Sequence, residues 1–78
     1  MDTKLDRITL NPKVLAGKPT IRGLRISVEQ ILAALANDVP FDDLLQDYPE
    51  LEREDILACL QYASQRVSED RVYPVGAP

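Results

Sequence analysis

The stretch from Gly17 to Val28, which reads GKPTIRGLRISV, decides the fold of this chain. It contains two short pieces of strand-forming residues, Thr20-Ile21 and Leu24 to Ile26, which are separated at Gly23. Its last residues lead directly into the first predicted helix. The stretch is therefore predicted to join an N-terminal β element to a helical remainder.

A short strand is predicted before this stretch. Residues 7–10 alternate polar and apolar side chains, with Ile8 and Leu10 on one face. The pair Asn11-Pro12 ends the run, because proline cannot donate a hydrogen bond to a strand ladder. The two strands can pair as a short β-hairpin-like arm over residues 7–26. Since two strands alone are marginally stable in water, the arm must pack on the helices or on another chain.

The first helix has the clearest start in the sequence. Ser27 is a typical N-cap residue, and Gln30 follows it at the spacing of a capping box. Apolar residues then recur with helical period on one face. They are Val28, Ile31, Leu32, Leu35 and Val39. Asn37-Asp38 is a plausible left-handed exit from this helix.

Two more helices are predicted downstream. Phe41 to Tyr48 repeats the helical spacing, and Pro49 ends that helix. The third helix is expected from about Arg53 to Arg66. By spacing, its inward residues are Ile56, Leu57, Leu60, Ala63 and Val67. The chain is thus mainly α, with a trihelical helix-turn-helix bundle over residues 27–67.

The chain is expected to form one domain, residues 1–67, followed by a flexible C-terminal tail, residues 68–78, that contains two prolines and a glycine. A core this small contributes little stability beyond the entropy of folding. With one cysteine and no histidine, a disulfide and the usual zinc sites are excluded. We therefore expect a homodimer or another obligate complex.

Charge is divided unevenly along the chain. Residues 1–26 carry six basic and two acidic side chains, a net charge of +4. Residues 27–78 carry three basic and 11 acidic side chains, a net charge of −8. This division indicates either a basic contact surface on an acidic body or simply a solvated charged surface.

Catalysis is not expected. Cys59 has no histidine to act as its base, and its mid-helix position favours a buried structural thiol. The acids Asp42, Asp43 and Asp47 lack the spacing of a calcium loop and fit a solvated helix face, so no metal or cofactor is predicted. Gly17-Lys18 is not part of a complete phosphate-loop motif and fits a turn. The chain has neither a signal peptide nor an apolar run that could span a membrane, so we expect a cytoplasmic protein.

The chain resembles a known family of small bacterial proteins, domain of unknown function 433. The resemblance covers Ile8 to Ala63 and rests on the runs AGKPTIRGLRISVEQILAALAN and DDLLQDYPELEREDILACLQYA. Its landmarks are Gly17-Lys18-Pro19, Ile21-Arg22-Gly23, Arg25-Ile26, Asp47-Tyr48-Pro49-Glu50-Leu51 and Asp55-Ile56.

The resemblance implies a homeodomain-like helical bundle after the β arm. Family members are often proposed to be antitoxins, encoded beside a PIN-like ribonuclease toxin. The sequence departs from the family pattern at three places. The family usually has a glycine where this chain has Asp38, a Ser or Thr cap followed by proline where it has Pro40-Phe41, and Ser or Thr where it has Glu52. These departures weaken the predicted helix caps.

Four basic residues are the candidate partner- or DNA-binding residues: Lys18, Arg22, Arg25 and Arg53. The three in the arm, Lys18, Arg22 and Arg25, could grip DNA phosphates, pair with carboxylates in the acidic metal-binding pocket of a ribonuclease, or pair with acids of this chain. Arg53 is predicted to be an exposed residue of the third helix. The acids at the start of the third helix would repel phosphates, which argues against that helix as a reader of DNA bases.

The leading hypothesis is an antitoxin-like binding protein that neutralises a PIN-like ribonuclease toxin and binds its own operator DNA. A DNA-binding transcriptional regulator without a toxin partner is the first alternative. The second is a non-catalytic oligomerisation domain whose arm pairs strands between subunits.

Overall fold

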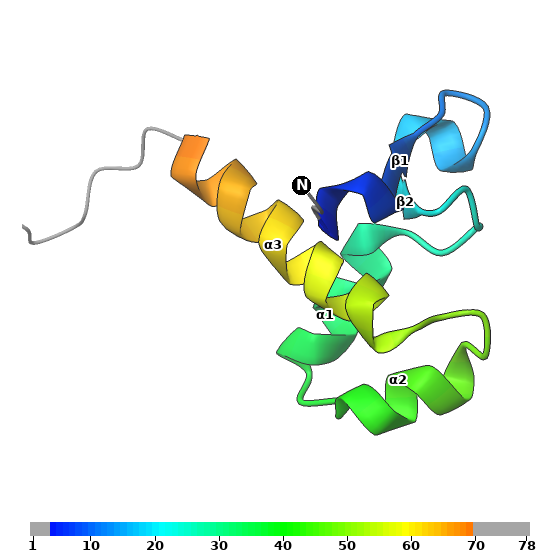
Figure 1. The fold of residues 1–78 in the computed structure, drawn as a ribbon, viewed down its shortest axis with the longest axis vertical. Coiled ribbons are helices and arrows are strands. Elements are labelled where there is room, and N and C mark those ends of the chain that lie inside the picture. Colours follow the sequence, from blue (N-terminus) through cyan, green and yellow to red (C-terminus); the bar gives the residue numbers. More distant parts are fainter. Residues whose placement is uncertain (1–3, 70–78) are drawn as a thin grey trace, which may run out of the picture.

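The structure, a computed structural model, describes residues 4–69. In these residues, two short antiparallel strands precede three helices, which confirms the predicted class (Figure 1). The elements are the 3-10 turn η1 (Lys4–Arg7), β1 (Ile8–Leu10), the 3-10 turn η2 (Leu15–Gly17), β2 (Pro19–Ile21), α1 (Val28–Ala36), α2 (Phe41–Asp47) and α3 (Arg53–Glu69).

The strands form a hairpin, in which Ile8 lies opposite Ile21 and Thr9 lies opposite Thr20. The hydroxyls of the two threonines are 2.9 Å apart and share a hydrogen bond. Ile21 is fully buried, so the hairpin contributes directly to the core. The predicted arm is therefore packed on the helices.

The second strand-like piece, Leu24 to Ile26, is not a strand. Arg22 and Gly23 both have left-handed backbones, with φ of 48° and 73°, and they turn the chain back on itself. The amide of Ile21 then donates to the carbonyl of Ile26 at 3.1 Å. The alternation of apolar residues suggested a second strand, but the left-handed turn at Arg22 and Gly23 leaves only a bridge between Thr20 and Ser27.

Helix α1 begins as predicted. The Ser27 hydroxyl accepts a hydrogen bond from the Gln30 amide at 3.0 Å. The Gln30 side chain, however, donates to the Tyr48 hydroxyl at 2.8 Å, so it ties α1 to the end of α2. Asp38 lies just beyond α1 with φ of 67°, which is the predicted left-handed exit.

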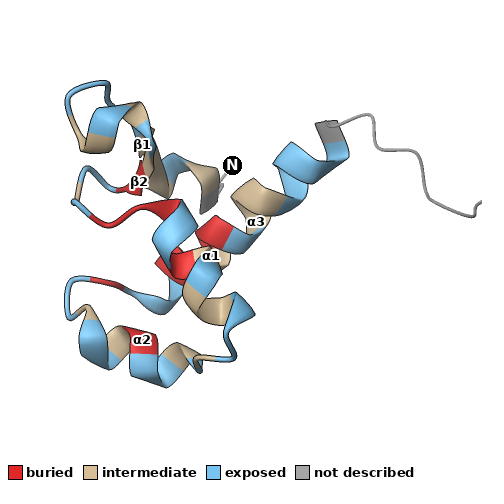
Figure 2. Ribbon diagram, turned by 180° about the vertical axis from the view of Figure 1, so that it is seen from behind, coloured by how far each residue is buried: buried red, intermediate tan, exposed pale blue. Residues whose placement is uncertain are grey.

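The core lies where the hairpin meets the three helices, and its buried residues gather there in Figure 2. Ile21 comes from β2, Ile31 from α1, Leu44 from α2 and Ile56 from α3. The prediction that Leu60 and Val67 face inward is wrong, because these residues are 40% and 65% exposed.

Those two residues are exposed because α3 is longer than the elements that cover it. Cys59 is the last fully buried residue of α3, and the helix continues past the body of the domain (Figure 1). The helix also continues beyond the predicted end of the bundle at residue 67, through Ser68 to Glu69. No proline or glycine interrupts the helix there. The remainder of the predicted tail, residues 70–78, lies outside the described residues.

The Ser27 cap can be tested by substitution. Ser27→Ala removes the acceptor of the Gln30 amide and is expected to lower the free energy of unfolding by about 1 kcal/mol. Urea unfolding followed by circular dichroism measures this change. Ser64→Ala is the matched control, because Ser64 is exposed inside α3 and caps nothing. Equal effects of the two substitutions would contradict the role of the cap.

Candidate functional site

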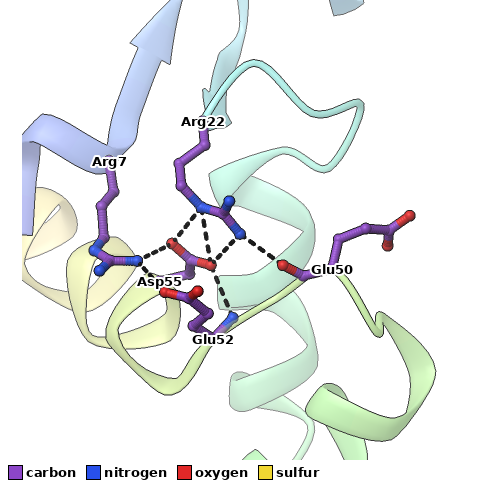
Figure 3. Close-up of polar contacts among 5 residues, drawn as sticks. All are labelled: Arg7, Arg22, Glu50, Glu52 and Asp55. Atoms are coloured by element: carbon purple, nitrogen blue, oxygen red, sulfur yellow. Dashed lines mark hydrogen bonds and ion pairs between the residues drawn. The ribbon is translucent and has the colours of Figure 1, made fainter.

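A buried carboxylate, Asp55, lies at the centre of the polar structure (Figure 3). Its Oδ1 accepts from Arg7 Nη1 at 2.9 Å and from Arg22 Nε at 3.1 Å. Its Oδ2 accepts from Arg22 Nη2 and from the Glu52 amide, each at 2.8 Å. We call Arg7, Arg22 and Asp55 the Asp55 cluster. Both oxygens of the buried carboxylate are fully engaged, as a buried charge requires.

The local sequence explains how these side chains meet. Asp55 lies in the first turn of α3, three residues after Glu52, so its carboxylate can reach back to the Glu52 amide and cap the helix. Arg7 immediately precedes β1, and Arg22 follows β2, so the hairpin brings the two arginines together. Their backbones are also joined, because the Arg22 amide donates to the Arg7 carbonyl at 2.7 Å.

The Asp55 cluster also holds the connection between α2 and α3. Arg22 Nη2 donates to the Glu50 carbonyl at 2.6 Å, and Arg7 Nη1 forms an ion pair with Glu52 Oε1 at 2.8 Å (Figure 3). One cluster therefore fastens the hairpin, the α2–α3 connection and the start of α3 to one another.

Charge stabilisation keeps the cluster ionised. Burial alone would raise the pKa of Asp55, but hydrogen bonds from Arg22, the Glu52 amide and Arg7 outweigh it and leave that pKa below its ordinary value. The pKa of Arg7 is raised by its hydrogen bonds to Glu52 and Asp55, and the pKa of Arg22 is raised by its hydrogen bond to Asp55. The three groups are therefore charged at neutral pH.

The cluster changes the interpretation of Arg22. The sequence places Lys18, Arg22 and Arg25 together as outward-facing basic residues. In the structure the Arg22 guanidinium is directed at the buried Asp55, because the left-handed turn at Arg22 points the side chain towards α3 (Figure 3). Of the alternatives for this residue, pairing with an acid of the same chain is the one observed.

The other two residues of the basic stretch lie near the start of α1. Lys18 Nζ forms an exposed ion pair with Glu29 Oε1, in the first turn of α1, at 3.0 Å. Arg25 is exposed two residues before the Ser27 cap, and its side chain forms no ion pair with any residue from 4 to 69. We call Lys18 and Arg25 the basic edge.

The fourth candidate, Arg53, lies elsewhere. It is the first residue of α3, and its guanidinium carbon lies 4.9 Å from the centre of the Phe41 ring at the start of α2. This is the geometry of a cation–π contact. The surface around it is acidic. The exposed acids of α2, of the α2–α3 connection and of the start of α3 are Asp42, Asp43, Asp47, Glu50, Glu52 and Glu54.

These acids do not assemble a metal site. Within residues 4–69, no three acidic or cysteine side chains come together closely enough to hold a metal ion. Cys59 is buried as predicted. Burial and the nearby charge of Asp55 raise the pKa of the Cys59 thiol to about 12, so it stays protonated and weakly nucleophilic at neutral pH.

Sequence reasoning missed the roles of Arg7 and Asp55. The available signal was Asp55 at the N3 position after a poor capping residue, Glu52. No local pattern pairs Asp55 with arginines 33 and 48 residues away.

Comparison with known proteins identifies the family. The family model described as protein of unknown function (DUF433) matches residues 8–63, which span the hairpin, α1, α2 and the first two-thirds of α3. The chain belongs to the DUF433 family. No curated protein matches the chain.

A solved structure supports the same assignment. The crystal structure of a DUF433 member protein from Anabaena variabilis is 33% identical to this chain and superimposes with a TM-score of 0.75. The matched region covers 81% of this chain and 62% of the Anabaena chain, so the present chain matches less than two-thirds of that protein. In the part of the chain described here, none of the helices has the length and apolar composition needed to cross a membrane.

The Asp55 cluster should contribute more to the free energy of unfolding than an exposed ion pair does. The double substitution Arg7→Ala and Arg22→Ala leaves a buried carboxylate with only one backbone donor, and is expected to lower the free energy of unfolding by about 3–5 kcal/mol. Urea unfolding measures it. Lys18→Ala, which removes an exposed ion pair, serves as the control and should change stability by less than about 1 kcal/mol. Similar losses in the two variants would contradict a dominant cluster.

The cluster also predicts a dependence on pH. Because the pKa of Asp55 is lowered by folding, its ionised form stabilises the fold above about pH 4, the ordinary carboxyl range. That stabilisation is lost as pH falls through the lower folded pKa. The advantage in unfolding free energy of the wild type over Asp55→Asn should therefore shrink as pH falls from about 4 towards 2. Parallel stability curves for the two proteins across this range would refute the assignment.

Proposed function

We propose that this DUF433 protein is an antitoxin-like regulatory binding protein that neutralises a PIN-like ribonuclease in the cytoplasm and acts as a homodimer. The antitoxin assignment comes from the family resemblance. The observation that carries it on this chain is the basic edge, where Arg25 is exposed without an ion-pair partner among residues 4–69.

The basic edge suits an acidic protein partner. A guanidinium can bind a carboxylate through two parallel hydrogen bonds, and the carboxylates of a metal-dependent nuclease offer that geometry. Arg25 would bind without first breaking an internal ion pair. Lys18 can exchange its exposed Glu29 partner at little cost, because such surface pairs contribute about 0–1 kcal/mol. Arg22 is excluded from this role, because its guanidinium already binds the buried carboxylate of Asp55 and moving it to a partner would break the Asp55 cluster.

A second candidate is a DNA-binding regulator without a toxin partner. The short α2, the tight connection and the long α3 favour it, because this order matches a helix-turn-helix. The exposed acids of α2 and the start of α3 oppose phosphate binding through those helices. We therefore assign operator binding to the basic edge of a dimer. A non-catalytic oligomerisation domain remains the third alternative.

The test uses the protein encoded by the adjacent reading frame, if it has a PIN-like sequence. Binding is measured by calorimetry and inhibition by ribonuclease assay, with wild type and the double variant Lys18→Glu and Arg25→Glu. The variant should bind at least about tenfold more weakly, because truncated charge pairs at interfaces are worth about 2 kcal/mol or more. Arg53→Ala is the control and should bind like wild type.

The outcomes separate the candidates. No interaction with the adjacent protein, or the absence of a PIN-like neighbour, would contradict the antitoxin proposal. Salt-sensitive binding to the upstream DNA that Arg53→Ala abolishes would favour reading by α3. Circular dichroism of each variant confirms that lost binding is not lost folding.

A further inference from the structure

An apolar surface covers the C-terminal half of α3, the part that extends past the body. Two hollows flank this half of the helix and share Tyr62 and Arg66. One, of about 510 Å³, lies between α3 and α1 and includes Val67. The other, of about 270 Å³, lies between α3 and the η1–β1 segment and includes Leu10. We call α3 from Tyr62 to Val67, with both hollows, the apolar face.

This face continues the core side of α3 beyond the core. Ala63 follows Ile56 by seven residues, and Tyr62 and Arg66 follow Cys59 by three and seven, so they lie on the same side of the helix. Ile56 and Cys59 are fully buried, whereas Leu10 and Val67 are 66% and 65% exposed. A helix of 17 residues is about 25 Å long, and its residues 64–68 are exposed. The end of the helix therefore presents a core-like side that is only partly covered.

We propose that a second copy of this chain covers the apolar face, with the two α3 helices packed antiparallel about a twofold axis. The pairing rests on the homodimer that belongs to the proposed function. It assigns the dimer contact to the end of α3 and to the hollow between α3 and α1, which borders the basic edge because Glu29 in its wall pairs with Lys18.

Charge on the two walls of the larger hollow makes the face self-complementary. The α1 wall carries the acid Glu29 and the α3 wall carries the base Arg66. In a twofold arrangement the same patch meets itself, so Arg66 of one copy can approach Glu29 of the other and the reverse pair forms as well. These contacts can add to those that both side chains make within their own chain. A patch with one sign of charge would repel its own copy.

The composition of the face fits a contact between copies. Exposed valine and leucine beside a tyrosine match the apolar centre and aromatic content of such contacts.

The test is sedimentation equilibrium of the full 78-residue chain without any partner. Wild type should form a dimer, and Val67→Glu should weaken self-association at least about tenfold, because it places a charge at the centre of the contact. Leu10→Glu probes the second hollow and should also weaken it. Gln61→Glu is the matched control, since Gln61 lies on a different side of the same helix from Val67 and lines neither hollow, and it should leave the dimer unchanged.

A charge exchange tests the twofold geometry. Glu29→Arg and Arg66→Glu should each weaken the dimer several-fold, and the double variant should restore most of the affinity. A monomer at every concentration up to about 1 mM would overturn the proposal, as would a dimer unaffected by Val67→Glu and Leu10→Glu. Toxin binding is measured separately, so a wild type that stays monomeric but still binds the partner would reject this interface without rejecting the basic edge.

Discussion

The buried carboxylate of Asp55 is the constraint on which the rest of the structure depends. A charge in the interior is tolerated only when it is paired and fully hydrogen-bonded. Here the partners are the two arginines at the open end of the hairpin and the Glu52 amide in the α2–α3 connection. The hairpin has three residues in each strand, too few to be stable alone. Arg7 and Arg22 fix it to α3, while Ile21 places its apolar side in the core. One ionic cluster thus attaches the hairpin to the helices in a chain whose apolar core is small.

The same cluster determines which basic residues remain for a partner. Arg22 reaches Asp55 because its backbone adopts φ of 48°, and the chain then turns to bring Arg25 out beside the start of α1. The positive charge of the N-terminal part of the chain is therefore partly internal. The basic edge and Lys13 stay outside, and the exposed acids lie on α2 and around the start of α3. The charge asymmetry of the sequence becomes two surfaces of opposite sign on different elements.

Local signals in the sequence predicted the local structure well. Ser27 caps α1 because its hydroxyl reaches the amide of Gln30, three residues later. Asp38 forms the exit from α1 because aspartate tolerates the left-handed backbone that the exit needs. The Asp55 cluster could not be predicted in this way, since its partners lie 33 and 48 residues away and are joined only by the tertiary fold. The prediction that Leu60 and Val67 are buried was wrong for a different reason. Helical period indicates which side of a helix faces the core, but it does not indicate where the neighbouring elements end.

The length of α3 divides the helix into a part inside the domain and a part that extends beyond it. Its first half, from Arg53 to Cys59, belongs to the domain, because Asp55 and Ile56 are fully buried against the hairpin and the other helices. Beyond Ala63 the residues of α3 up to Ser68 are exposed, so a substitution such as Val67→Glu can change association with little loss of core contacts. The basic edge lies next to the larger hollow, since Lys18 pairs with Glu29 in the wall of that hollow, but Arg25 lines neither hollow. A dimer formed through α3 would therefore leave both copies of Arg25 available, and two linked copies can hold a dimeric target or two half-sites more tightly than one.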